Sequence, residues 1–186
     1  EGIVLTVFPE CCLTGYVYND RAELEAAAIA ADGPEIERIR AACAEASMHA
    51  VVGLFEADGG RVYNTALLIG PDGVIGRHRK RHLPFLGGDR FVDQPEGIEP
   101  AVFDFPVGKV GLAICYEIRF PEVVRTLVLS GAEIVVLPTN WPVASRILAD
   151  LFTPVRAAEN FVYFLAANRN DNEDGTAFLG SSQIVD

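Results

Sequence analysis

The stretch that decides the fold is GLAICYEIRFPEVVRTLVLSGAEIVVLP, residues 111–138. Its first apolar residues predict a strand over residues 110–114 that leads into Cys115, and a helix is expected from Pro121 to about Ser130. A second, fully apolar strand is expected over residues 134–137. A strand, a helix and a further strand in this order predict an α/β fold, with mixed sheets where hairpins are inserted.

The same alternation extends in both directions along the chain. A helix is expected over residues 34–48, because Pro34 suits the first helical position and apolar residues follow at helical spacing. Residues 77–97 are expected to form a polar, basic loop. Apolar residues within 147–152 predict a helix that kinks at Pro154 or restarts there with Thr153 as its N-cap. Further strands are expected over residues 3–8, 50–55, 62–69, 74–76, 102–105, 161–167 and 176–185. No repeat or linker interrupts the pattern, so we expect a single domain over residues 1–186.

The composition limits the classes of partner. The 186 residues carry a net charge of −11, and 50% of them are hydrophobic. An acidic surface repels nucleic acids and anionic membranes, and no apolar run is long enough to cross a bilayer, so we expect neither as a partner. The cysteines form no CxxC pair, the histidines lack zinc-ligand spacing, and no secretory signal is found. We therefore expect a cytoplasmic protein with no metal and no cofactor.

Cys115 is the candidate nucleophile. A thiol at a strand-to-helix corner is held on a rigid element, and the free backbone N–H groups beside it can bind an oxyanion. Taken alone, a packed core cysteine is the more common interpretation of such a residue. The catalytic interpretation therefore needs partner groups elsewhere in the chain.

Two such partners occur at strand ends. Glu10 directly follows the expected strand 3–8, and Lys80 lies in the basic segment 77–84, which by itself predicts a solvated loop or an anion-binding patch. Strand ends on the same edge of a sheet bring distant residues within a few ångströms. Glu10 as base, Lys80 as electrostatic stabiliser and Cys115 as nucleophile would complete an acyl-transfer site without histidine or metal.

At these residues the sequence resembles the nitrilase superfamily, the carbon–nitrogen hydrolases. Residues 8–10 (Phe-Pro-Glu), 79–83 and 114–122 resemble that family's glutamate, lysine and nucleophile motifs, and residues 131–138 and 156–160 resemble its flanking segments. Two positions depart from the common pattern. Glu117 stands where many members have aspartate, and Asp89 aligns with a second active-site glutamate and is one methylene shorter.

The resemblance implies an α-β-β-α sandwich that usually pairs into homodimers through helical faces. It also implies that the chain lacks an N-terminal strand and helix and a C-terminal segment, because Glu1 opens directly into a strand and residues 183–186 end in one.

The resemblance implies hydrolysis through a thioester. Glu10 would take the thiol proton, and Lys80 with the backbone N–H of Tyr116 would stabilise the oxyanion. Lys80 is expected to favour the thiolate form of Cys115, and a closed pocket is expected to raise the pKa of Glu10. The residues expected to line the substrate pocket are Asp89, Tyr116, Asn140 and Trp141, with Tyr16 a weaker candidate.

Several functions stay open at this point. A small amide is the favoured substrate, and an N-carbamoyl amine or a nitrile suits the same triad. From other classes, a non-catalytic α/β interaction module or degenerate fragment would use the basic loop for docking, and a metal-dependent hydrolase is a third reading.

Overall fold

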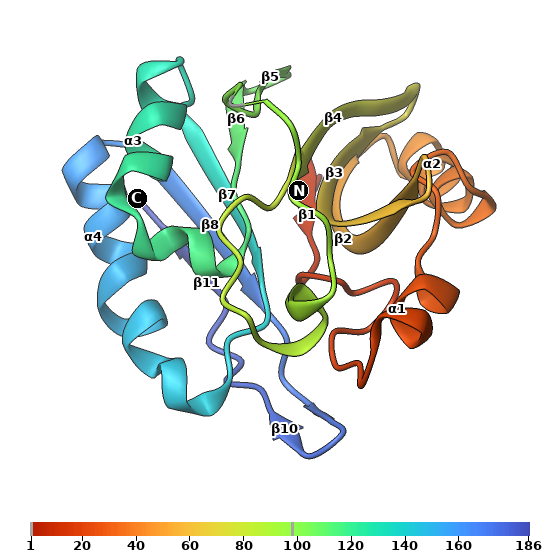
Figure 1. Cartoon of the computed structure of the whole chain (residues 1–186). Helices are drawn as coiled ribbons and strands as arrows, with labels where there is room; N and C mark the ends of the chain where they lie inside the picture. Colours follow the sequence, from red (N-terminus) through yellow and green to blue (C-terminus); the bar gives the residue numbers. More distant parts are fainter. Residues whose placement is uncertain (1, 98) are drawn as a thin grey trace.

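The computed structural model describes residues 2–97 and 99–186, so Glu1 and Ile98 lie outside the described residues. Two sheets pack face to face, with helices on the outer side of each (Figure 1). This is the α-β-β-α order that the family resemblance implies. Among the described residues, no helix has the length and apolar character needed to cross a membrane.

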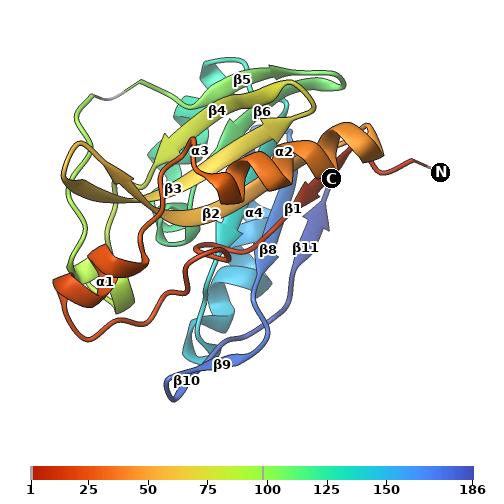
Figure 2. The same ribbon diagram turned by 90° about the vertical axis from the view of Figure 1, so that its right-hand side faces the viewer.

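The first sheet contains four strands in the order β1-β2-β3-β4. Strand β1 is parallel to β2, and β2, β3 and β4 form an antiparallel meander. Figure 2 shows α2 lying along this sheet and α1 beyond its end. The bounds are β1 Leu5–Val7, α1 Arg21–Ala27, α2 Pro34–Ala46, β2 His49–Asp58, β3 Arg61–Gly70 and β4 Gly73–Arg79.

The second sheet contains five strands in the order β11-β8-β7-β6-β5, in which β6, β7 and β8 are parallel. Helices α3 and α4 cover its outer face (Figure 1). The bounds are β5 Val102–Phe105, β6 Gly108–Leu112, α3 Pro121–Leu129, β7 Ile134–Thr139, α4 Thr153–Asn160, β8 Tyr163–Asn168 and β11 Gln183–Val185. A small hairpin, β9 Asn172–Glu173 with β10 Thr176–Ala177, projects from its lower end.

Strand β3 shows how one strand serves two cores. Its side chains at Ala66 and Leu68 join the cluster between the two sheets. Those at Leu67 and Ile69 join the cluster beneath helix α2. Alternate residues of a strand point to opposite faces, so a strand covered on both sides reads as continuously apolar.

The structure corrects three expectations. Strand β4 runs to Arg79, so the first part of the expected basic loop is strand. Residues 148–152 form a π-helical turn that continues directly into α4, because the Thr153 hydroxyl donates to the Leu148 carbonyl at 2.9 Å and does not cap a new helix. The expected strand 176–185 is two short strands, β10 and β11, separated by irregular chain.

Candidate active site

Cys115 lies at a sharp turn after strand β6. It is the first residue of a short 3-10 helix, Cys115–Arg119, and its φ of 47° falls in the left-handed region. A non-glycine residue in this region carries strain of about 1–2 kcal/mol, and such residues cluster at functional sites. The turn leaves the side chain 6% exposed at the wall of a pocket.

Lys80 joins two carboxylates at the end of strand β4. Its ammonium nitrogen Nζ lies 2.6 Å from Glu10 Oε1 and 2.5 Å from Asp89 Oδ2, and all three side chains are buried. Asp89 reaches Lys80 because it lies on a 3-10 helix, Gly87–Arg90, that approaches the strand end. The shorter side chain at this position therefore still makes the contact.

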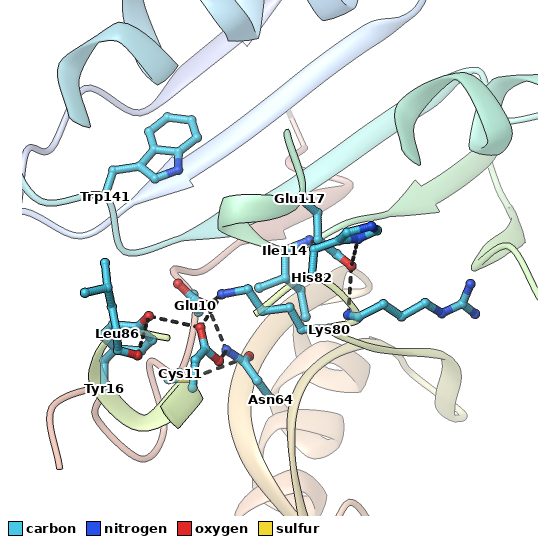
Figure 3. Close-up of polar contacts among 12 residues, drawn as sticks. Glu10, Cys11, Tyr16, Asn64, Lys80, His82, Leu86, Ile114, Glu117 and Trp141 are labelled. Carbon is cyan, nitrogen blue, oxygen red and sulfur yellow. Dashed lines mark hydrogen bonds and ion pairs between the residues drawn. The ribbon is translucent and has the colours of Figure 1, made fainter. Parts of the chain in front are cut away.

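Two further residues complete this network (Figure 3). The Asn64 amide nitrogen donates to Glu10 Oε1 at 2.8 Å and to Asp89 Oδ1 at 2.7 Å. The Tyr16 hydroxyl donates to Asp89 Oδ2 at 3.0 Å. Asn64 was not predicted from the sequence, where its one signal is a polar residue within a buried strand, and Tyr16 was predicted only as a pocket residue.

The charges of this network are set by burial and by contact. Burial by itself would lower the pKa of Lys80, but the charges of Asp89 and Glu10 raise that pKa well above its usual value, so the lysine stays protonated. Burial raises the pKa of Glu10, and the opposing charge of Lys80 offsets only part of this effect. Glu10 Oε2 has no hydrogen-bond partner among the described residues. Glu10 is therefore placed to exchange a proton through that oxygen, and the expected rise of its pKa is found.

Lys80 acts on Cys115 in the expected direction, because its charge lowers the pKa of the thiol, but it does not decide the protonation state. Burial raises the pKa of the Cys115 thiol, the charge of Glu10 raises it further, and the opposing charge of Lys80 is too weak to reverse this. The thiol is neutral at pH 7 and needs a base.

Glu117 connects the nucleophile turn to the lysine strand. Its carboxylate accepts hydrogen bonds from the backbone N–H of Ile114 at 2.8 Å and of Arg81 at 2.9 Å, and it lies 2.7 Å from His78 Nε2. Burial by itself would raise the pKa of Glu117, but the His78 contact and the Arg81 N–H hold it well below its usual value. His82 Nδ1 lies 3.7 Å away. The carboxylate is thus ionised, and its partners flank Cys115 and Lys80.

A pocket of about 500 Å³ opens in front of Cys115. Three residues expected there, Tyr116, Asn140 and Trp141, line it, as does Tyr16. Asn140 and Trp141 are buried, at 2% and 1% exposed. The fourth expected lining residue, Asp89, is buried against Lys80 and is not part of the wall. The remaining wall is largely apolar.

Two observations concern metals and thiols. No group of three or more His, Cys, Asp or Glu side chains in the described ranges is arranged to hold a metal ion. The four cysteines are free, and Cys11 lies 3.6 Å from Asn64 Oδ1.

This geometry agrees with the comparison to known proteins. The family model described as carbon-nitrogen hydrolase matches residues 1–186. The chain belongs to this family. A nitrilase of Pyrococcus abyssi is 37% identical over 188 residues, covering 100% of this chain and 69% of the relative. An (R)-stereoselective amidase of Pseudomonas sp. is 34% identical, covering 98% of this chain and 65% of the relative. The chain thus spans about two thirds of the length of these carbon-nitrogen hydrolases.

Solved structures of carbon-nitrogen hydrolases share the fold. An amidase from Nesterenkonia sp. matches with a TM-score of 0.81 at 25% identity, over 97% of this chain and 68% of that one. In a mutant of the Nesterenkonia sp. AN1 amidase with the same TM-score, the acetamide moiety of fluoroacetamide is added covalently at the active-site cysteine. The expected nitrilase-superfamily fold class is confirmed.

Proposed function

We propose that this carbon-nitrogen hydrolase cleaves a small amide to an acid and ammonia or an amine through a thioester on Cys115. One observation carries the proposal. The buried ammonium of Lys80 contacts two buried carboxylates, Glu10 and Asp89. The charge of Glu10 also raises the pKa of the Cys115 thiol, which lies in a left-handed turn at the pocket. Perturbed titratable groups clustered in this way are typical of active sites.

Each group has a role in this reaction. Glu10 takes the Cys115 proton, and the sulfur attacks the amide carbon to form an S–C bond. Lys80 and the Tyr116 backbone N–H stabilise the oxyanion. The C–N bond then breaks, and Glu10 gives its proton to the departing nitrogen. Glu10 next takes a proton from water, whose oxygen attacks the thioester carbon. The C–S bond then breaks, the acid leaves, and Glu10 gives the proton back to the Cys115 sulfur.

The raised pKa of Glu10 suits both proton transfers. A carboxyl group near its ordinary pKa is a weak base at pH 7, and burial makes it a stronger one. Lys80 stays protonated through the cycle because its two carboxylate neighbours favour the charged form. The lysine thus acts as a fixed charge and Glu10 as the proton carrier.

The alternative substrates differ in support. The relatives include proteins named nitrilase and proteins named amidase, so an N-carbamoyl amine or a nitrile remains the second candidate.

The non-catalytic module has less support. Its docking surface would be the basic segment, yet Arg77 and Arg79 pair with Glu56 at 2.7 and 2.8 Å. Arg79 also pairs with Asp58 at 2.6 Å, so two acids offset the two positive charges.

A homodimer formed through helical faces is part of the proposal, as are a single domain over residues 1–186 and a cytoplasmic location. Large apolar side chains are exposed on and beside α3 and α4, among them Leu129 at 74% and Phe161 at 96%. Large exposed apolar patches on soluble proteins mark interaction sites. Light scattering of wild type and Phe161→Glu tests the dimer.

The catalytic proposal is tested by ammonia release from a panel of amides, carbamoyl compounds and nitriles. Cys115→Ala and Lys80→Ala in the full-length protein are expected to abolish release, and Cys43→Ala, which removes a buried cysteine of helix α2, is the matched control. Mass spectrometry of rapidly quenched wild type is expected to show an acyl adduct on Cys115. Release retained in Cys115→Ala or Lys80→Ala would overturn the proposal.

A further inference from the structure

The side chain of Asn140 is the least satisfied polar group in the pocket. It is 2% exposed, lines the pocket together with Cys115, and neither its Oδ1 nor its Nδ2 has a hydrogen-bond partner among the described residues. Asn140 directly follows strand β7 and shares the pocket wall with Cys115. A buried amide with both ends unpaired requires an explanation, because buried polar groups in folded proteins are almost always hydrogen-bonded.

The other buried asparagines make the contrast clear. Asn168 Oδ1 accepts from the Trp141 N–H at 2.7 Å, and its Nδ2 donates to the Gly180 carbonyl at 2.6 Å. Asn64 uses its amide nitrogen twice, and Asn160 donates to a backbone carbonyl at 3.0 Å. This fold therefore pairs the amide groups of its other buried asparagines, whereas Asn140, in the pocket wall, has an unpaired donor and an unpaired acceptor among the described residues.

A second observation points to a ligand at the same place. The indole nitrogen Nε1 of Trp141 is also buried without a partner, and the indole lines the pocket beside Asn140. The backbone of Trp141 is fixed by Asn168, so the orientation of this segment is set before substrate arrives. The pocket wall thus holds three N–H bonds, two on Asn140 and one on Trp141, and one amide oxygen without partners among the described residues.

We propose that Asn140 selects substrates that carry an N–H group on the carbon that is attacked, which means carboxamides and carbamoyl compounds, over nitriles and esters. This inference rests on the proposed function. Asn140 Oδ1 accepts from the substrate N–H, while its Nδ2 donates to a substrate oxygen. Nitriles and esters have no N–H to offer and leave Oδ1 buried and unpaired. Sites built to pair a substrate N–H discriminate strongly against analogues that lack it, because the unpaired group is costly.

The experiment compares kcat/KM for a primary carboxamide, the methyl ester and the nitrile of the same acid. Wild type is expected to prefer the carboxamide over the nitrile by at least about tenfold. Asn140→Leu is expected to slow both amide and ester, since both present a carbonyl oxygen, but to lower the amide-to-ester ratio about tenfold. Asn140→Asp keeps an acceptor of the same shape and is expected to retain the ratio.

Asn160→Leu is the matched control, because it removes a buried asparagine outside the pocket, and its ratio is expected to stay within about threefold of wild type. An unchanged ratio in Asn140→Leu, or a wild-type preference for the nitrile, overturns the inference while amide hydrolysis stands. A wild type that cleaves none of the substrates overturns the proposed function as well. If Asn140→Leu fails to fold, the wild-type comparison of amide and nitrile decides.

Discussion

Replacing Glu117 with glutamine tests whether one buried carboxylate holds the nucleophile and the lysine in register. Glutamine has the same shape but one acceptor oxygen. If that oxygen keeps the Ile114 N–H and His78, the new amide group faces the Arg81 N–H, which loses its partner. The reverse orientation leaves the Ile114 N–H unpaired instead. At least one buried backbone donor is therefore orphaned in either orientation.

The cost follows from these contacts. An orphaned buried donor costs about 1–3 kcal/mol, and the remaining bonds lose about 1 kcal/mol because their acceptor is no longer charged. We expect Glu117→Gln to lower the free energy of unfolding by about 3 kcal/mol, measured by urea denaturation at pH 7. We also expect kcat to fall about 10- to 100-fold with a smaller change in KM, because Cys115 and Lys80 shift relative to each other.

The pH dependence separates the charge from the shape. The folded-state pKa of Glu117 lies below its unfolded value, so its stabilisation is fully present above that unfolded value, about 4.3, and is lost as the pH falls toward the folded-state pKa. The stability difference between wild type and Glu117→Gln should therefore stay nearly constant from pH 7 to about pH 5 and shrink as the pH falls below about 4. Glu122→Gln, an exposed change in the same motif, should stay within about 0.5 kcal/mol of wild type. If Glu117→Gln has the same free energy of unfolding and the same kcat as wild type, the Glu117 carboxylate does not hold Cys115 and Lys80 in place.

Three further predictions concern Glu10, the proposed base. Because burial raises the pKa of Glu10, the acid limb of the kcat/KM profile should lie above pH 4.5, and a limb at or below that value would contradict the assignment. Asn64→Ala removes a hydrogen bond that lowers the Glu10 pKa, so its acid limb should move to higher pH than in wild type; an unmoved limb would show that the bond is absent in solution. Gly53→Ala places a Cβ 2.4 Å from the Cys11 nitrogen and 2.8 Å from the Glu10 backbone, so ammonia release should drop and stability should fall by about 1–3 kcal/mol, as seen by calorimetry.

The alternation of strands and helices and the candidate residues at strand ends were predictable because their signals are local, whereas the sandwich followed from the family resemblance. Cys115 follows an apolar strand and precedes a proline-started helix, and Glu10 follows another apolar strand. The contact between Asp89 and Lys80 was not predictable, since its length depends on how a 3-10 helix approaches the end of β4. Sequence spacing carries no information on such an approach.

The protonation state of Cys115 was not predictable for a different reason. A lysine near a thiol favours the thiolate, but the sequence shows neither the burial of the thiol nor the charge of Glu10, and both raise the thiol pKa. The prediction of a solvated basic segment was wrong for a similar reason. Arg77 and Arg79 look solvated in sequence, yet they pair with Glu56, a buried acid on β2 that reads as part of an ordinary strand. The protonation state of the thiol and the pairing of the arginines both depend on contacts between residues far apart in the sequence.

The proposed base and the proposed nucleophile belong to different sheets. Glu10 and Lys80 follow strands β1 and β4 of the four-stranded sheet, whereas Cys115 and Asn140 follow β6 and β7 of the five-stranded sheet. An acyl group bound to Cys115 would therefore link residues of the two sheets. Ligands stabilise the state that they bind. A covalent acyl analogue on Cys115 should therefore slow hydrogen exchange in β4 and β6 together, although these strands share no hydrogen bond.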